Sequence, residues 1–348
     1  MSPTNVDIAE LLARAAEAAD GHRARAYRTA SVAALMWSEE AADLVAADRS
    51  LTELERIGPS LARRVRGWIE DPPAIPPPPP TRAGFGSFAG AISRIARELA
   101  WGAPRGDLQM HTTFSDGKVT LEQMALTGIE LGYRYVAITD HSKGLRIANG
   151  IDEATLGAQG EQIEAFNDKL AADGLDFRVL RSVEMNLDTA GAGDMDAEAL
   201  GKLDLVLGSF HSALRSTEDE TNRYLAAVRN PHVDVIGHPR GRKYNLRLGL
   251  QADWTRVLEA AAAHGKAMEI NAYPNRQDLS VDLLEIAREA GGWVSIGTDA
   301  HDPTEMRFLP VGIAAALDAG IPRDRILNFL ERDELVAWVA ARRGRAQS

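Results

Sequence analysis

The sequence predicts an α/β protein in which a barrel of parallel βα units follows a small all-helical domain. Short apolar segments alternate with helical patterns over roughly 240 residues at the C-terminal end of the chain. A proline-rich stretch at 71–80 separates this part from a helical N-terminal part. The length of 348 residues exceeds one average domain and accommodates a barrel of about 250 residues with a small addition.

The N-terminal part, residues 1–70, carries apolar residues at helical spacing, and short helices are expected near 38–47, 51–56 and 60–69. The segment D-P-P-A-I-P-P-P-P-P at 71–80 cannot be helical, because proline lacks the backbone donor and clashes with the preceding turn. We therefore expect a helical module at 1–70, a stiff linker at 71–85 and a second domain at 86–348.

The second domain is expected to begin with a helix near 88–99. Its predicted strands include 135–138, 177–180, 205–207, 233–236, 268–270 and 293–296. Its predicted helices are 121–131, 155–172, 218–229, 252–264 and 281–290. Six or seven strands that alternate with helices favour a closed or nearly closed barrel over an open sheet.

Composition excludes several classes of protein. The chain has no cysteine, which rules out disulfides, thiolate metal sites and thiol nucleophiles. The net charge of -11 repels nucleic acid and anionic membranes, so a polyanionic substrate would need a local basic patch. There is no apolar run long enough to span a bilayer, and the N-terminus lacks the pattern of a signal peptide. The expected compartment is the cytoplasm, with no membrane partner.

Five of the eight histidines follow predicted strands, and carboxylates accompany them. In a parallel barrel, such positions gather at the rim where barrel enzymes place their active sites. One histidine there is usually structural, but five together with acids form a ligand set for zinc, iron or manganese. The histidines are His111, His141, His211, His238 and His301, and the acids are Asp107, Asp116, Asp140, Glu184, Glu269 and Asp299.

Other residues near this rim have two interpretations. Arg240, Arg242, Lys243 and Arg276 either neutralise a substrate phosphate or form a solvated loop with salt bridges to acids. Asn271 and Asp140 either orient ligands or cap strand ends. Phosphate loops, dinucleotide loops and serine-hydrolase elbows are absent from the sequence, which leaves hydrolysis by metal-activated water.

Seven strings in order resemble the polymerase and histidinol phosphatase (PHP) family, most closely the C-terminal PHP domain of bacterial family X DNA polymerases. They are G-D-L-Q-M-H-T-T-F-S-D-G at 106–117, I-T-D-H-S at 138–142, V-E-M-N at 183–186, G-S-F-H-S at 208–212, G-H-P-R-G-R at 237–242, E-I-N-A-Y-P-N-R at 269–276 and G-T-D-A-H-D-P at 297–303. The resemblance implies a distorted (β/α)7 barrel that holds up to three divalent metals.

The resemblance also implies a ligand set. It assigns His111, Glu184 and Asp299 to one metal, with Gln109 where most relatives have histidine. Glu184 would bridge to a second metal with His211 and His238, and Asp116, His141 and His301 would hold a third. An amide oxygen is a weaker ligand than imidazole and favours manganese or magnesium. The resemblance favours phosphate contacts for Arg242 and Arg276, so the expected catalytic residues are Glu184, Arg242, Arg276 and Asn271.

The string L-T-E-L-E-R-I-G-P-S-L-A-R-R-V at 51–65 resembles a helix-hairpin-helix, in which a glycine turn and helix amides hold a DNA phosphate. Gly58 is present, but Arg56 occupies the position of the usual first glycine. His22 to Arg28 resembles the start of the N-terminal domain of family X polymerases. We expect Gly58, Arg63, Arg64 and Arg28 to contact DNA; the alternative is an ordinary helical hairpin with surface arginines.

These features predict a phosphoesterase that depends on manganese or zinc, with iron or magnesium as alternatives. The expected activity is 3′-5′ exonuclease or 3′-end processing in DNA repair, on single-stranded DNA or a 3′ overhang, without an obligate protein partner. Two alternatives stay open. One is a small-molecule phosphatase of histidinol-phosphate or nucleotide type, and the other is a DNA-binding module with a degenerate metal site.

Overall fold

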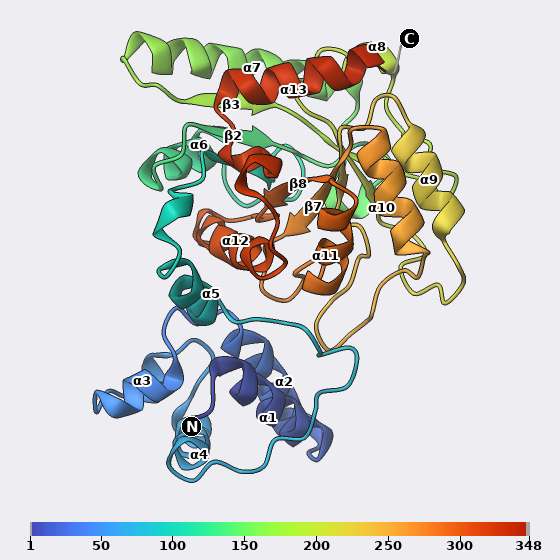
Figure 1. Ribbon diagram of the computed structural model, residues 1–348. Helices are drawn as coiled ribbons and strands as arrows, with labels where there is room; N and C mark the ends of the chain where they lie inside the picture. The colour runs from blue at the N-terminus through green and yellow to red at the C-terminus, as the bar shows by residue number, and fades with distance from the viewer. Residues whose placement is uncertain (1, 346–348) are drawn as a thin grey trace.

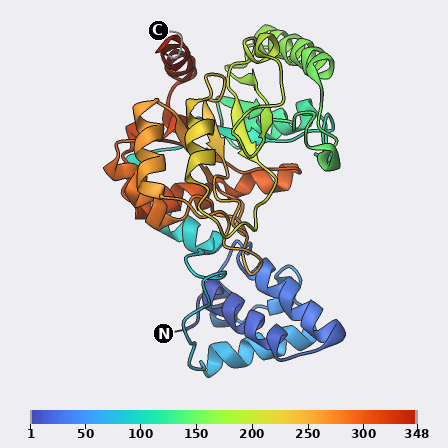
Figure 2. The same cartoon turned by 90° about the vertical axis from the view of Figure 1, so that its right-hand side faces the viewer.

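The chain folds into two lobes, a small helical lobe and a larger α/β lobe (Figure 1). The computed structural model describes residues 2–345. The helical lobe contains α1 (Asn5–Glu17), α2 (Gly21–Ala34), α3 (Ala41–Ala46) and α4 (Pro59–Glu70). The α/β lobe begins with α5 (Phe88–Ile95), which lies where the two lobes meet. Figure 2 shows the same division from the side.

Local sequence explains where the helices of the small lobe begin. At α1 the Thr4 hydroxyl accepts a hydrogen bond from the Asp7 N–H, and the Asp7 carboxylate accepts one from the Thr4 N–H, which is a capping box. Helices α1 and α2 then pack against each other through Ile8, Leu12 and Ala30, all completely buried. The lobe therefore has an apolar core of its own, which favours folding as a unit.

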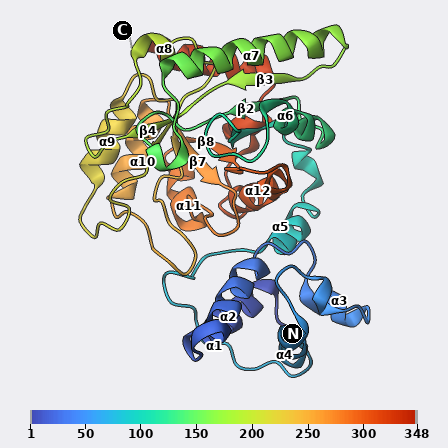
Figure 3. The same cartoon turned by 180° about the vertical axis from the view of Figure 1, so that it is seen from behind.

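The linker between the lobes is extended, as its prolines predict. Residues 72–79 contain no helix or strand, and Figure 3 shows this segment running along the outside of the helical lobe. Arg82 ends it: its side chain is 3% exposed and donates to both carboxylate oxygens of Glu10 and to Asn245 Oδ1 on the α/β lobe. A buried bidentate ion pair with this third contact fixes how the lobes meet.

All strand pairs of the α/β lobe are parallel, which confirms the predicted class. One sheet contains β1 (Gly106–Met110), β2 (Tyr135–Ile138) and β3 (Arg178–Arg181) in that order. The other contains β4 (Glu184–Leu187), β5 (Leu207–Phe210), β6 (Val235–Gly237), β7 (Ala267–Asn271) and β8 (Trp293–Gly297).

Isolated hydrogen bonds join the two sheets at both margins. The N–H of Glu184 donates to Thr139 O at 3.2 Å, and the N–H of His111 donates to Ala300 O at 2.8 Å. Strands β3 and β4 are separated by Ser182 and Val183 alone, so they are two halves of one interrupted strand. The ring of strands is thus a distorted barrel of seven positions rather than one continuous ladder.

Helices surround this barrel. They are α6 (Leu121–Glu130), α7 (Glu153–Ala172), α8 (Ala197–Leu200), α9 (Thr221–Arg229), α10 (Trp254–Ala263), α11 (Val281–Glu289), α12 (Leu309–Asp318) and α13 (Arg332–Arg345). No helix among residues 2–345 combines the length and apolar character that crossing a bilayer requires. Helix α13 packs Leu335 and Trp338 against Leu108 and Tyr135, which closes the end of the barrel where the strands begin.

The structure departs from the expected elements in several places. The helix expected at 51–56 is a single 3-10 turn, Leu51–Glu53, because the chain turns at Arg56 with φ 63°. The helix expected from 218 begins at Thr221, since Asp219 caps its first turn. Helices α12 and α13 were not predicted. The helical lobe packs beside the opposite end of the barrel from α13, where the strands end (Figure 1).

Candidate metal centre

The strand ends position the predicted ligands. His111 follows β1, His141 follows β2, His211 follows β5 and His238 follows β6. Because parallel strands all point the same way, these side chains meet at one rim. Asp299 and His301 follow β8, Asp116 lies in the loop after β1, and Glu184 opens β4. Asp299 and His238 adopt positive φ values of 56° and 24°, and such backbone strain is typical of functional sites.

Glu184 is the centre of the cluster. It is fully buried, and four imidazoles surround its carboxylate. Oε1 lies 2.7 Å from His238 Nε2 and 3.1 Å from His211 Nε2, while Oε2 lies 3.2 Å from His141 Nδ1 and 3.4 Å from His111 Nε2. Neither oxygen accepts a hydrogen bond from any residue that the structure describes. A buried carboxylate with free lone pairs amid imidazole nitrogens suits a bridging metal ligand.

Asp299 forms a second group with His111 and Glu184. Its Oδ1 lies 3.1 Å from His111 Nε2, and the ligand atoms of the three residues lie within 4.8 Å of one another. Asn271 Nδ2 donates to Asp299 Oδ2 at 3.2 Å, and Arg276 Nε lies 3.4 Å from the same oxygen. Asn271 therefore holds the Asp299 carboxylate in place, and Arg276 lies at the edge of the cluster.

Asp116, His141 and His301 form a third group together with His111. Asp116 Oδ1 lies 3.2 Å from His301 Nε2 and 3.6 Å from His141 Nε2. The His111 ring stacks on the rings of His141 and His301, with centroids 4.3 Å apart in both pairs. The two ring nitrogens of His141 thus face two different groups, which links the three groups into one cluster.

Electrostatics in the cluster suit cations. Burial raises the pKa of Glu184, but the imidazoles of His141, His238 and His211 outweigh it, so the pKa lies well below its usual value. For Asp299, burial is outweighed by Arg276 and His111, and the pKa is also lowered. Burial and the neighbouring His111 lower the pKa of His141 to about 3, which keeps its imidazole neutral. Anionic carboxylates and a neutral imidazole are the states in which these groups bind metals.

His301 behaves differently, because acids face it. Burial lowers its pKa, but Asp116 and Asp299 outweigh that effect and raise the pKa to about 9. In the absence of a cation, a proton on this ring offsets the surrounding negative charge. The unpartnered carboxylate oxygens of Glu184 and the donor set as a whole therefore fit divalent metal ions that would replace such protons.

Gln109 lies on β1 and is fully buried, and neither atom of its amide has a hydrogen-bond partner among the described residues. The Gln109 Oε1 lies close to Gly297 of β8. A Cβ atom added to Gly297 would be 3.0 Å from this oxygen and would also clash with Glu269 Oε1. Burial raises the pKa of Glu269 well above its usual value, while its Oε2 accepts a hydrogen bond from the His238 N–H. The Gln109 amide is thus a neutral polar group without a hydrogen bond, next to the strands that carry the proposed metal ligands.

Three residues that contact the cluster or the loop beside it were not anticipated. Asn186 Oδ1 lies 3.1 Å from His211 Nδ1, and Glu305 accepts a hydrogen bond from the His301 N–H at 2.8 Å. Gln159 donates to Asp140, which also binds Thr112 and Ser115 and so fixes the loop after β1. Asn186 belongs to the V-E-M-N string, so the sequence could have indicated it. Glu305 and Gln159 are recognised only from their tertiary contacts.

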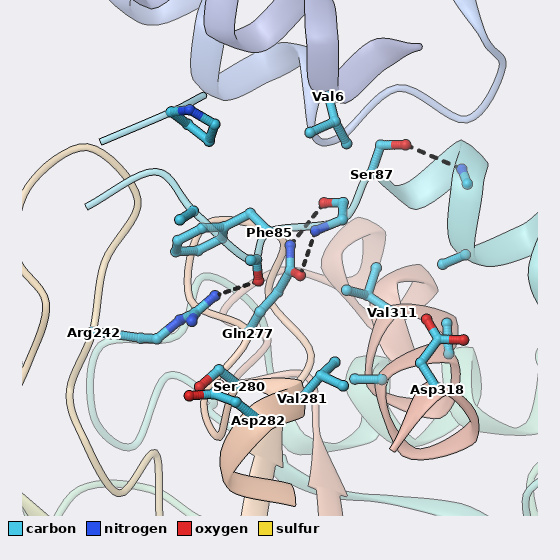
Figure 4. Close-up of a pocket in the computed structure, with 18 of the residues that line it drawn as sticks. Val6, Phe85, Ser87, Arg242, Gln277, Ser280, Val281, Asp282, Val311 and Asp318 are labelled. Carbon is cyan, nitrogen blue, oxygen red and sulfur yellow. Dashed lines mark hydrogen bonds between the residues drawn. The ribbon is translucent and has the colours of Figure 1, made fainter. Parts of the chain in front are cut away.

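Arg242 is not brought to the cluster. It is buried where the linker meets the barrel, and its guanidinium lies 3.9 Å from the centre of the Phe85 ring and donates to Gly84 O and Arg276 O (Figure 4). The cavity beside it measures about 970 Å³, and no predicted metal ligand lines it. Arg242 therefore anchors the linker and reaches the cluster only through the backbone of Arg276.

The residues expected to contact DNA lie in the helical lobe. Gly58 precedes α4 as its N-cap, and Arg56 before it has the positive φ that glycine adopts easily. Arg64 donates to the Tyr27 hydroxyl at 2.6 Å and stacks on that ring, so its guanidinium is already engaged. Arg63 and Arg28 are exposed and form no hydrogen bond or ion pair with any described residue.

Comparison with known proteins identifies related sequences. Residues 107–273 match the PHP domain. A DNA polymerase/3′-5′ exonuclease PolX from Bacillus subtilis is 36% identical over 266 residues, which cover 76% of this chain and 46% of that protein. The match thus spans about half of the PolX length. A probable phosphatase from Edwardsiella ictaluri is 30% identical over 238 residues, covering 65% of this chain and 90% of that protein.

One solved structure aligns with 70% of this chain, and the alignment covers 94% of the chain in that structure. The TM-score is 0.44 and the sequence identity is 16%. It is a histidinol phosphate phosphatase from Lactococcus lactis in complex with zinc, L-histidinol and phosphate.

Proposed function

The chain belongs to the PHP family, and from that membership we propose that it is a metal-dependent phosphoesterase that trims DNA in the 3′-5′ direction. The observation that carries this proposal is the Glu184 carboxylate, buried without a hydrogen bond among four imidazoles at the rim. Phosphoester hydrolysis requires a concentrated positive charge and an activated water, and this ligand set is suited to hold both.

The proposed ligands are the nine residues expected from the sequence. Glu184 would bridge, His211 and His238 would bind on one side of it, and His111 with Asp299 on the other. Asp116, His141 and His301 would hold a third ion, and Gln109 would supply a neutral oxygen. When bound, manganese or zinc ions would lower the pKa of a water molecule and offset charge on the phosphate.

The other polar residues of the rim have separate proposed roles. Asn271 holds Asp299 in place through its amide. Arg276, which is paired with Asp299 and lies at the edge of the cluster, would contact a phosphate oxygen during the reaction. Arg242 would act indirectly, because its hydrogen bond to the Arg276 carbonyl fixes that residue's backbone. It is a positioning residue rather than one that touches substrate.

Three features support DNA as the substrate. The PolX relative is named as a 3′-5′ exonuclease, and its match extends over 76% of this chain. The helical lobe carries, before α4, the segment whose sequence resembles a helix-hairpin-helix, with Gly58 at the N-cap of α4. Arg28 and Arg63 on that lobe are exposed and free to pair with phosphates.

One observation favours a second candidate, a phosphatase for small phosphomonoesters. The match to the probable phosphatase from Edwardsiella ictaluri covers 90% of that protein, whereas the match to PolX covers 46%. The α/β lobe alone thus corresponds to a nearly complete phosphatase. The two candidates differ in what the helical lobe does, because only a DNA substrate would engage it.

A denaturing-gel time course tests the proposal. Single-stranded DNA labelled at its 5′ end is incubated with the manganese-loaded full chain beside a Glu184→Gln variant, which keeps the side-chain shape but loses the bridging charge. We expect a ladder of shortened products that is absent with Glu184→Gln. An untouched strand, together with rapid hydrolysis of p-nitrophenyl phosphate, would establish the phosphatase instead.

A further inference from the structure

A cleft of about 650 Å³ lies between the helical lobe and the rim of the barrel, separate from the cavity beside Arg242. One wall comes from α2 and the turn before α4, and includes Arg28, Met36 and Arg56. The other wall comes from loops that follow β1, β7 and β8, and includes Lys118, Tyr273 and Arg307. The two lobes therefore form this cleft together.

The cleft borders the third group of proposed metal ligands. The backbone N–H of Lys118 donates to the carbonyl of His301 at 2.8 Å. Glu305, which also lines the cleft, accepts from the His301 N–H at 2.8 Å and from the Tyr273 hydroxyl at 3.3 Å. Residues of the barrel wall thus bond directly to the backbone of His301, although no proposed metal ligand lines the cleft itself. A strand in the cleft would approach the metal centre from the side of His301.

The lining of this cleft carries four cations and three acids and so has a slight positive balance, although the whole chain carries a net charge of -11. The side chains of Arg28 and Arg307 are exposed and form no hydrogen bond or ion pair with the described residues, although the Arg307 guanidinium lies 5.0 Å from the centre of the Phe308 ring. Arg56 pairs only with its exposed neighbour Glu55 at 3.5 Å, and Lys118 with Asp302 at 3.7 Å. Such exposed pairs contribute little, so these cations remain available to an anionic ligand.

The acids of the cleft are partly committed to other donors. Glu305 accepts from the Tyr273 hydroxyl and the His301 N–H, and Asp302 accepts from the N–H and hydroxyl of Thr304. Tyr273 contributes partly exposed aromatic surface beside the cations, and the buried Phe308 ring packs behind it with the ring centroids 5.5 Å apart. Cations interleaved with aromatic faces are the features that bind the phosphates and bases of a single strand.

We propose that this cleft holds the segment of single-stranded DNA that leads into the metal centre, with Arg28, Arg56, Lys118 and Arg307 facing its phosphates. This inference rests on the proposed function and extends it, because it assigns the strand a path and gives the helical lobe a role. Cations on both walls suit a ligand with several phosphates, whereas one mononucleotide would pair with few of them.

The test compares two double variants of the full chain, both in the Glu184→Gln background so that the DNA stays intact. Arg28→Ala/Arg307→Ala removes one unpaired cation from each wall. Arg23→Ala/Arg229→Ala is the matched control, because both arginines are exposed, form no ion pair with described residues and lie outside the cleft. Fluorescence anisotropy measures the affinity for a labelled single strand over a series of salt concentrations.

We expect the cleft variant to bind on the order of tenfold more weakly than its parent, and the control to bind as the parent does. Each lost phosphate contact lowers the slope of log K against log salt by about 0.7, so the slope should fall by about 1.4. An unchanged affinity and slope, an equal loss in the control, or no binding of the parent to DNA would each overturn the cleft proposal. Thermal melts verify that both variants are folded.

The gel assay of the unmodified chain separates the two proposals. If that chain shortens DNA while the cleft variant binds like its parent, the function stands and the cleft assignment fails. If binding depends on the cleft but no strand is shortened, the cleft assignment stands and the exonuclease proposal fails.

Discussion

At the residue scale, the cluster combines strong and weak ligands. Four imidazoles surround one buried carboxylate, whereas Gln109 offers a neutral amide whose atoms have no partner among the described residues. An imidazole is a better donor than an amide oxygen for zinc and manganese alike. In the proposed ligand set, Gln109 would therefore limit how tightly the group around His111 and Asp299 holds an ion.

Replacing Gln109 by histidine should strengthen that group. We expect Gln109→His to raise metal affinity on the order of tenfold, because an imidazole lone pair replaces the weaker amide oxygen. Metal content per chain after competition with a chelator gives the measurement. The surface variant Gln162→His controls for an added histidine outside the cluster, since Gln162 is exposed on α7. Equal metal retention by both variants would contradict a ligand role for position 109.

At the scale of elements, the turn between the 3-10 helix and α4 brings strain and charge together. Arg56 has a φ of 63°, in the left-handed region that glycine adopts without cost, and its side chain lines the cleft. A non-glycine residue in that region costs about 1–3 kcal/mol. A charged residue in a glycine position is the pattern expected where function opposes stability.

Arg56→Gly should separate these two effects. Relief of the strained φ, partly offset by the greater freedom of glycine in the unfolded chain, should stabilise the protein by about 0.5–1 kcal/mol. The same change should weaken binding of single-stranded DNA, since one cation leaves the cleft. Urea denaturation and anisotropy provide the two readouts. A variant that is more stable and binds DNA with unchanged affinity would remove Arg56 from the proposed path.

At the scale of the whole molecule, the contact between the lobes decides whether the helical lobe faces the metal centre. Arg82 is the central residue of that contact, because its buried guanidinium joins Glu10 of α1 to Asn245 of the barrel. Ser31 on α2 and Tyr244 of the barrel add a second buried contact, with their hydroxyl oxygens 3.2 Å apart. The cleft exists only while these contacts hold the lobes in this arrangement.

Arg82→Ala should therefore lower the free energy of unfolding by about 3–5 kcal/mol, because Glu10 would remain buried with less compensation. Arg14→Ala removes the other cation beside Glu10, but the Arg14 side chain is 35% exposed, so we expect a loss of about 1 kcal/mol or less. Urea denaturation of the two variants measures this difference. Similar losses would show that burial of the Arg82 ion pair does not hold the lobes together.

The sequence by itself predicted the α/β class, the helical N-terminal part and the proline-rich extended segment. Alternation of apolar strands with helical patterns is a local signal, and so is proline's missing donor. The strand-end histidines predicted a shared rim, because parallel strands bring equivalent positions together whatever the remaining contacts are. Helices α12 and α13 lay outside the prediction, and α13 in particular is stabilised by packing Trp338 against the barrel.

The tertiary structure decided what local patterns do not encode. Arg242 and Arg276 both belong to strings that resemble the PHP family, and both were expected to contact phosphate. In the structure, Arg242 stacks on Phe85 of the linker and Arg276 pairs with Asp299. One ring nitrogen of His141 faces Asp116 and the other faces Glu184. This arrangement depends on how β2 and β4 lie relative to each other. The cleft joins residues more than 200 positions apart, such as Arg28 and Arg307, and only the packing of the two lobes brings them together. Burial and long-range contact, unlike periodicity, are properties of the folded chain.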